Sequence, residues 1–183
     1  QNINLNFIIE QLEPVFVDRI NIYGNNVTKE VVIRNQLEID EGDPYNEILA
    51  NKSINNIKSL NFFKSVKSEV AQGVSEDTKK INIIVEEKPT GEIFAGAGVG
   101  TSGSSVSFGV KENNYLGNGV SVASNVTLTE ESLKGLFSVT NPNFKNTDKS
   151  IYFTAEAIEI DRLTAYGYKT NKTGGSIGTN FEY

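Results

Sequence analysis

A two-residue alternation of apolar with small or polar side chains fills the second half of this chain. In residues 120–128, valine and leucine occupy most even positions, while the odd positions are small or polar. A period of two is typical of a β-strand with one apolar and one polar face. Segments of about 9–11 residues also suit tilted strands that cross a bilayer. We predict six such strands after Pro89, at residues 91–100, 104–112, 119–129, 132–140, 150–160 and 173–183.

The alternation also assigns side chains to the two faces of these strands. One face is largely apolar, and the other carries Ser, Thr, Asn, Lys and Glu. In a membrane barrel the apolar face contacts lipid, but a soluble β-sandwich alternates in the same way, so the pattern alone leaves both open. The residues expected on the lipid-facing side are Val106, Phe108, Val110, Val120, Val122, Val126, Leu128, Phe137, Val139, Ile151 and Phe153.

Before Pro89 the periodicity is mixed and includes helical spacing. We expect strands at residues 3–12, 15–23, 62–70 and 80–87. Thr28 predicts the N-cap of a short helix, and Asp43 followed by Pro44 predicts the start of a longer one. The order β-α-α-β-β predicts a small sheet covered on one face by two helices, which is an α+β fold.

Composition excludes several kinds of chemistry. The 183 residues include no cysteine and no histidine, which removes disulfides, thiolate metal sites and histidine-dependent catalysis. The net charge of -6, without a Lys/Arg cluster, argues against nucleic acid as a partner. No run of about 18 apolar residues predicts a transmembrane helix. We therefore expect no enzyme: no catalytic residue, no cofactor and no metal site.

Both ends of the chain have strand-like sequence. Residues 1–8 already alternate, and residues 176–183 end without a closing turn. Six strands are also fewer than the eight or more of known closed membrane barrels. We therefore expect the sequence to be part of a longer protein.

Several segments resemble a known family. Residues 17–25, 41–44 and 60–66 resemble a POTRA (polypeptide-transport-associated) domain, and residues 85–91 resemble its join to a barrel. Residues 113–119 and 138–144 resemble the first two periplasmic turns in the BamA family, and residues 173–176 resemble the start of the sixth strand. The resemblance implies the end of a preceding POTRA domain at 1–13, a POTRA domain at 14–89, and an incomplete antiparallel transmembrane β-barrel at 90–183.

The resemblance implies a function without covalent chemistry. The family folds and inserts β-barrel proteins into the outer membrane of Gram-negative bacteria, with its POTRA domains in the periplasm. The implied partners are unfolded outer-membrane proteins, periplasmic lipoproteins of an assembly complex, and outer-membrane lipid. A secretion translocator of the same superfamily is the main alternative, while a passive porin and a soluble adhesin sandwich fit less well.

The glycine-rich segment after Pro89 is the first candidate site. It lacks the strand–turn–helix context and the Lys-Ser/Thr of a phosphate-binding loop. Glycines weaken a strand because they remove side-chain packing and carry an entropic penalty. In the family, the first barrel strand borders a seam thought to open laterally; small residues that fit a crowded barrel interior are the other explanation. The implied lateral-gate residues are Glu92, Ile93, Phe94, Ala95, Gly96, Ala97, Gly98, Val99 and Gly100.

An acidic loop at residues 40–43 is the second candidate site. Its carboxylates lack the spacing of a calcium-binding loop. Because the family's last POTRA domain docks a lipoprotein, the resemblance implies a partner contact at Asp40, Glu41 and Asp43. Plain helix capping by this loop is the alternative.

Overall fold

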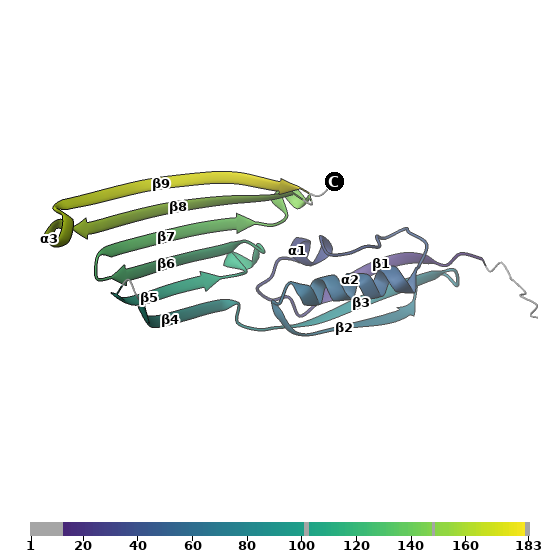
Figure 1. Ribbon diagram of the computed structural model, residues 1–183. Helices are drawn as coiled ribbons and strands as arrows, with labels where there is room; N and C mark the ends of the chain where they lie inside the picture. Colours follow the sequence, from purple (N-terminus) through teal and green to yellow (C-terminus); the bar gives the residue numbers. More distant parts are fainter. Residues whose placement is uncertain (1–12, 101–102, 148, 182–183) are drawn as a thin grey trace, which may run out of the picture.

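The computed structural model describes residues 13–100, 103–147 and 149–181, and it contains two β-sheets placed end to end (Figure 1). The strand expected at residues 3–12 lies outside the described residues. So does the proposed end of a preceding domain at 1–13, apart from Glu13. Among the described residues, no helix is both long and apolar enough to cross a membrane.

The first sheet has three strands in the spatial order β1-β3-β2. β1 runs parallel to β3, whereas β2 runs antiparallel to it. The expected order β-α-α-β-β is confirmed. The elements are β1 (Phe16–Tyr23), α1 (Glu30–Arg34), α2 (Glu47–Ser59), β2 (Phe63–Gln72) and β3 (Thr78–Glu87).

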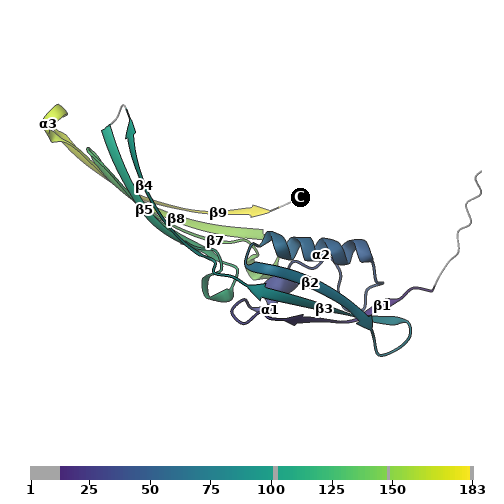
Figure 2. The ribbon, with the colours of Figure 1, turned by 90° about the horizontal axis from the view of Figure 1, so that it is seen from below.

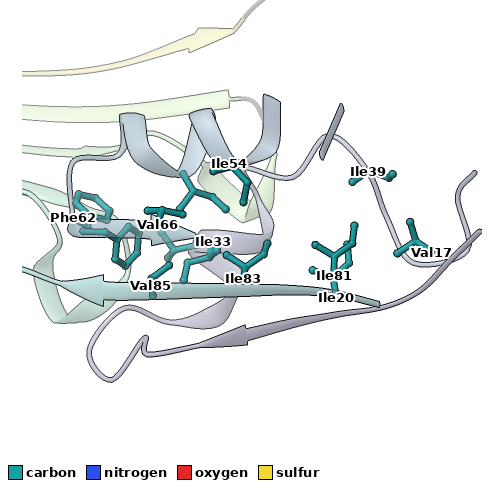
Figure 3. Close-up of a cluster of buried hydrophobic side chains, with 13 residues drawn as sticks. Val17, Ile20, Ile33, Ile39, Ile54, Phe62, Val66, Ile81, Ile83 and Val85 are labelled. Carbon is teal, nitrogen blue, oxygen red and sulfur yellow. The ribbon is translucent and has the colours of Figure 1, made fainter. Parts of the chain in front are cut away.

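The hydrophobic core lies between the helices and this sheet (Figure 3). Ile81, Ile83 and Val85 alternate along β3 and are all buried, as the strand period requires. Ile54 and Ile57, one helical turn apart on α2, are buried in the same cluster. Fully burying one such side chain contributes about 1.5–3 kcal/mol, so this cluster is the main source of stability of the small domain.

The start of α1 differs from the prediction. Lys29 occupies its N-cap position, and no side chain caps the helix. Thr28, expected as the cap, is buried and its backbone N–H donates to the Glu87 carboxylate at 2.6 Å. The prediction was wrong because a carboxylate 59 residues away along the chain binds the loop before the helix.

The start of α2 also differs. The Asn46 side chain caps the helix and accepts hydrogen bonds from the N–H groups of Ile48 and Leu49 at 2.9 and 3.3 Å. Asp43 instead accepts a hydrogen bond from the Asp40 N–H at 2.9 Å, within the acidic loop. Asp43 is therefore not the cap, because its carboxylate closes the preceding turn.

The second sheet is a six-stranded antiparallel meander in chain order, with β4 and β9 at its edges. The sheet is strongly curved (Figure 2). The expected strands are confirmed, and with them the fold class, an α+β domain followed by part of an antiparallel barrel. The strands are β4 (Gly91–Gly100), β5 (Gly103–Glu112), β6 (Ser121–Thr129), β7 (Ser132–Asn141), β8 (Lys149–Arg162) and β9 (Tyr168–Phe181).

The last strand begins earlier than predicted. It starts at Tyr168 instead of residue 173, because β8 extends to Arg162 and pairs with Tyr168 across the turn. A short helix, α3 (Leu163–Tyr166), and Gly167 with φ +74° close this turn. Residues 173–176 therefore lie inside β9 and not at its start.

The strand registers place the predicted apolar side chains on one face of the second sheet. Phe108 pairs with Val126, and Val139 pairs with both Val122 and Phe153. Directly paired residues share a face, so the apolar residues of neighbouring strands form one surface. This surface, the apolar face, carries Val106, Phe108, Val110, Val122, Val126, Leu128, Phe137, Val139, Ile151 and Phe153.

Val120 is the exception among the predicted lipid-facing residues. It lies outside β6, in the turn that follows β5. Its carbonyl oxygen accepts a hydrogen bond from the Tyr115 N–H at 2.8 Å, which closes this turn. The opposite surface of the sheet, the polar face, carries pairs such as Lys134 with Glu156, whose charged atoms are 2.6 Å apart.

Candidate functional site

β4 contains all nine predicted gate residues and forms one edge of the second sheet. It pairs with β5 along its full length, from Gly91 opposite Glu112 to Gly100 opposite Gly103. Within the described residues, no strand pairs with its other side. An edge strand presents a row of N–H and C=O groups to which another strand can add. The structure therefore offers a ten-residue backbone edge for strand addition.

The two faces of β4 differ in chemistry. Ala95 and Ala97 pair with Phe108 and Val106, so they lie on the apolar face. The glycines lie on the polar face opposite serines: a Cβ atom at Gly96 would lie 3.1 Å from the Ser107 hydroxyl oxygen. That contact is tight. It supports the explanation that small residues fit a crowded barrel interior, and this explanation stands beside that of a weakened strand.

A three-residue linker, Lys88 to Thr90, connects β3 of the first sheet to β4 of the second. The Lys88 N–H donates to the Phe62 carbonyl at 3.0 Å, and the Asn113 N–H donates to the Thr90 carbonyl at 3.2 Å. The linker is therefore hydrogen-bonded to the domains on both sides. This arrangement limits how freely the two sheets can rotate about their connection.

Glu87, the last residue of β3, binds the loop before α1. Its carboxylate accepts hydrogen bonds from the N–H groups of Val27 and Thr28, at 2.9 and 2.6 Å. Partial burial raises the pKa of Glu87, but the hydrogen bonds from Thr28 and Val27 outweigh it, and the pKa lies below its ordinary value. Ionised Glu87 thus holds this loop in place at neutral pH.

The same loop contacts the first turn of the second sheet. Thr28 and Asn114 are only 2% and 5% exposed, and the Asn114 amide donates to the Thr28 hydroxyl at 2.8 Å. The side-chain amide oxygen of Asn114 accepts from the Gly119 N–H, also at 2.8 Å. Backbone bonding adds a further link, because the Lys29 N–H donates to the Gly117 carbonyl at 2.9 Å. We call this set of contacts the domain joint.

Gly117 allows the two backbones of the domain joint to meet. Its φ is +71°, in the left-handed region that favours glycine. A Cβ atom here would overlap the Val27 carbonyl oxygen and lie 2.9 Å from its carbon. Sequence analysis placed residues 113–119 in a turn but missed this role, because the turn's Asn and Gly residues give no sign of a partner 86 residues away.

We expect Asn114→Ala to loosen the domain joint. It leaves the Thr28 hydroxyl and the Gly119 N–H buried without their partner, which costs about 1–3 kcal/mol. Distances between spin labels at Lys58 in α2 and Leu128 in β6 should then spread over a broader range.

Asn118→Ala is the matched control for this prediction. Asn118 is exposed and accepts a hydrogen bond from the Lys29 ammonium group at 2.6 Å. A surface contact of this kind contributes about 0–1 kcal/mol, so its loss should leave the distance distribution unchanged. An unchanged distribution in Asn114→Ala itself would contradict a structural role for the joint.

The acidic loop is bonded within its own domain. The Glu41 carboxylate accepts a hydrogen bond from the Ile20 N–H at 3.0 Å and lies 3.6 Å from the Arg34 guanidinium. Asp43 bonds to the Asp40 N–H, as described above. The alternative of helix capping is wrong, because Asn46 caps α2. Glu41 instead fixes the loop against β1, and Asp43 closes the turn within the loop.

Comparison with known proteins places the domains in a family. Residues 15–88 match the POTRA model, described as surface antigen variable number repeat. Outer membrane protein assembly factor BamA of Neisseria meningitidis serogroup B is 30% identical over 175 residues, which are 92% of this chain and 22% of the relative. BamA of Nitratidesulfovibrio vulgaris is 24% identical over 149 residues, or 81% and 19%. The chain spans about a fifth of the length of these relatives.

Solved structures show the same arrangement. BamA from Haemophilus ducreyi lacking POTRA domains 1–3 has a TM-score of 0.81 and 25% identity, covering 89% of this chain and 32% of that chain. CdiB from Acinetobacter baumannii shares the fold, with a TM-score of 0.58, 13% identity, and coverage of 90% and 32%. The fold is thus a POTRA domain followed by the first strands of an antiparallel barrel. These matches identify the chain as this part of a BamA-type protein, which confirms the resemblance in the sequence.

Proposed function

We propose that the chain is part of an outer-membrane β-barrel assembly factor of a Gram-negative bacterium. Its POTRA domain lies in the periplasm, and its second sheet is part of the barrel wall. The observation that carries this proposal is a POTRA domain joined through three residues to a strand with an open edge. The names of the matched relatives favour assembly over the alternative of a secretion translocator, and the POTRA domain argues against a passive porin.

The apolar face of the second sheet supports a location in the membrane. Val106, Phe108 and Leu128 on this face are more than half exposed. Soluble proteins rarely leave a large continuous apolar surface in water, whereas barrel walls present one to lipid. A soluble sandwich would bury this face against a second sheet, and within the described residues no sheet packs on it. We therefore assign the apolar face to contact with outer-membrane lipid.

Strand addition is the mechanism that the open edges support. In the first sheet β2 has an open edge, whereas the outer side of β1 is partly occupied by the acidic loop, whose Gly42 N–H donates to the Val17 carbonyl at 2.7 Å. In the second sheet β4 is an edge strand. Backbone hydrogen bonds supply the affinity in strand addition, which makes it tolerant of different substrate sequences. Unfolded outer-membrane proteins would first pair with the open POTRA edge, and β4 would then serve as the template for the incoming barrel.

Reconstitution of the whole protein tests this function. Vesicles that contain the full-length protein should fold a urea-unfolded outer-membrane barrel faster than protein-free vesicles of the same lipid. Folding is followed by the gel-mobility shift of the heat-sensitive folded barrel and by protease resistance. Equal folding rates in the two kinds of vesicle would contradict the proposed function.

The acidic loop is proposed as a contact for a periplasmic lipoprotein of an assembly complex. Glu41 remains about half exposed even though it bonds to the Ile20 N–H, so one carboxylate can serve both purposes. Asp40 and Asp43 lie beside it and add negative charge. A partner with a basic surface would be attracted to this loop, more strongly at low salt.

We expect Glu41→Gln to reduce recovery of the lipoprotein several-fold, because it removes the charge while its amide oxygen still accepts from the Ile20 N–H. Co-purification at low and high salt measures the effect, and the difference from the unmodified protein should be larger at low salt, where the Glu41 charge is least screened. Glu76→Gln in the β2–β3 loop is the matched control. Full recovery with Glu41→Gln and with Glu41→Lys, both folded, would leave only the structural role of the loop.

A further inference from the structure

Gly109 is an unusual residue in the second sheet. Among the described residues of its six strands, it is the only buried one, although it lies in the middle of β5. Its register partner on β4 is Phe94. A strand residue that is buried within a single sheet must be covered by a neighbouring side chain, and the geometry shows which one.

The Phe94 ring covers Gly109. A Cβ atom at Gly109 would overlap Cζ of the ring and lie 2.6 Å from both Cε atoms. Phe94 is 44% exposed, whereas the other large side chains of β4, Ile93 and Val99, are 77% and 90% exposed. Phe94 therefore makes the main side-chain contact of β4 with the rest of the sheet, and it fits only because residue 109 has no side chain.

At the start of β4 the register is marked by polar contacts, because the Asn113 amide donates to the Glu92 carboxylate at 3.2 Å. Between residues 95 and 100 the side chains of β4 distinguish poorly between registers. Gly96, Gly98 and Gly100 repeat on the polar face, and Ala95 and Ala97 repeat on the apolar face. If β4 slipped by two residues along β5, its polar and apolar residues would stay on their own faces. Within residues 95–100 each glycine would take the place of another glycine, and each alanine or valine that of another small apolar residue. The side-chain pattern of such a glycine-rich segment specifies register only weakly.

A slip by two residues would, however, displace Phe94 from Gly109. The ring would then face Ser107 or Lys111, the residues two positions away on β5. Both residues carry a side chain where Gly109 has none, so the ring could not lie over them as it lies over Gly109. Aromatic side chains that cover a glycine across a strand pair are known to pin register in sheets.

We infer that Phe94 and Gly109 form a register lock, which fixes β4 on β5 and so sets the height at which the open edge of β4 meets an incoming strand. This inference deepens the proposed function and rests on it. Phe94 is a positioning residue: it acts through the backbone of β4. It also ties β4 to β5, so the opposite side of β4 is the one that can separate.

A second pair of this kind supports the inference. On the polar face of β8 and β9, Tyr152 is the register partner of Gly178. A Cβ atom at Gly178 would overlap the tyrosine ring and lie 2.7 Å from its Cε1. β9 is also rich in glycine, so in this chain each of the two glycine-rich strands is matched to its neighbour by an aromatic ring over a glycine.

Disulfide formation in the full-length protein in vesicles, without substrate, tests the lock. Ala97→Cys with Val106→Cys reports the native register, because directly opposite Cβ atoms are close enough for a disulfide. Ala95→Cys with Val106→Cys, and Ala97→Cys with Phe108→Cys, report slips by two residues in either direction. With Phe94 present, only the first pair should oxidise readily.

We expect Phe94→Ala to raise the yield of the slipped disulfides about tenfold. Ile93→Ala, which removes an apolar side chain from the other face of β4, should leave the yields unchanged. The swapped variant Phe94→Gly with Gly109→Phe should restore the native pair, because the ring again covers a glycine. Lower thermal stability of Phe94→Ala with only the native disulfide would overturn the lock.

The readout separates the lock from the proposed function. The disulfide yields require no substrate, so they test the register alone. If Phe94→Ala shifts the register and assembly of a substrate barrel continues unchanged, the lock stands and templating by β4 is contradicted. If the register stays native, the lock is overturned whatever the assembly rate.

Discussion

Arginine in place of Val126 is expected to destabilise the barrel of the full-length protein by about 2–4 kcal/mol, the cost of a charge at the middle of a bilayer. Val126 lies on the apolar face, opposite Phe108, near the centre of β6. If that face contacts lipid, the guanidinium has no polar partner at this depth. Equilibrium unfolding by denaturant in lipid vesicles measures the difference.

The same strand provides two matched controls. Val122 lies on the same face but only one residue after β6 begins, so Val122→Arg should cost about 0–1 kcal/mol near the interface. Thr127→Arg lies on the polar face and should also be tolerated. Equal costs at residues 122 and 126 would contradict the placement of this face in lipid.

Much of the fold could be predicted because periodicity is local. Alternation in β5 and β6 was enough to place Phe108 and Val126 on one face, and the registers agree. Element ends were less predictable, because they depend on partners far along the chain. Thr28 has the chemistry of a helix cap, but the Glu87 carboxylate binds its N–H, and the Asn114 amide bonds to its hydroxyl.

The candidate site was predictable only in part. The glycine-rich strand was visible in the sequence, and the structure places its nine residues in one edge strand. That Phe94 covers Gly109 depends on the register of two strands, and a sequence of repeated glycine and alanine carries little information about register. For Glu41 the sequence leaves partner contact and helix capping open, and the structure shows a bond to the Ile20 N–H while Asn46 caps α2.

A disulfide that locks the outer edge of β4 is expected to abolish assembly. In a closed barrel no edge is free, so a strand can add only after some pair has separated. The glycines of β4 supply no side-chain packing, and Phe94 ties the strand to β5, so the outer side of β4 is the pair expected to open. The disulfide joins Ala95→Cys to a cysteine opposite it in the last strand of the complete barrel.

An interior disulfide is the matched control for the disulfide at the outer edge of β4. Val122 and Val139 are directly opposite on β6 and β7, so Val122→Cys with Val139→Cys can form the same bond away from the outer edge of β4. Assembly activity should be unaffected by this crosslink, because β6 and β7 do not have to separate. It controls for oxidation and for a general stiffening of the barrel.

Templating by β4 is tested most directly by the folding rate of an unfolded outer-membrane barrel. The rate is measured in one vesicle sample before and after reduction of the disulfide at the outer edge of β4. The expected result is no acceleration over protein-free vesicles while the disulfide is intact, and full acceleration once a reductant has opened it. Full acceleration with the disulfide intact would contradict templating and would favour a mechanism that acts only by thinning the membrane.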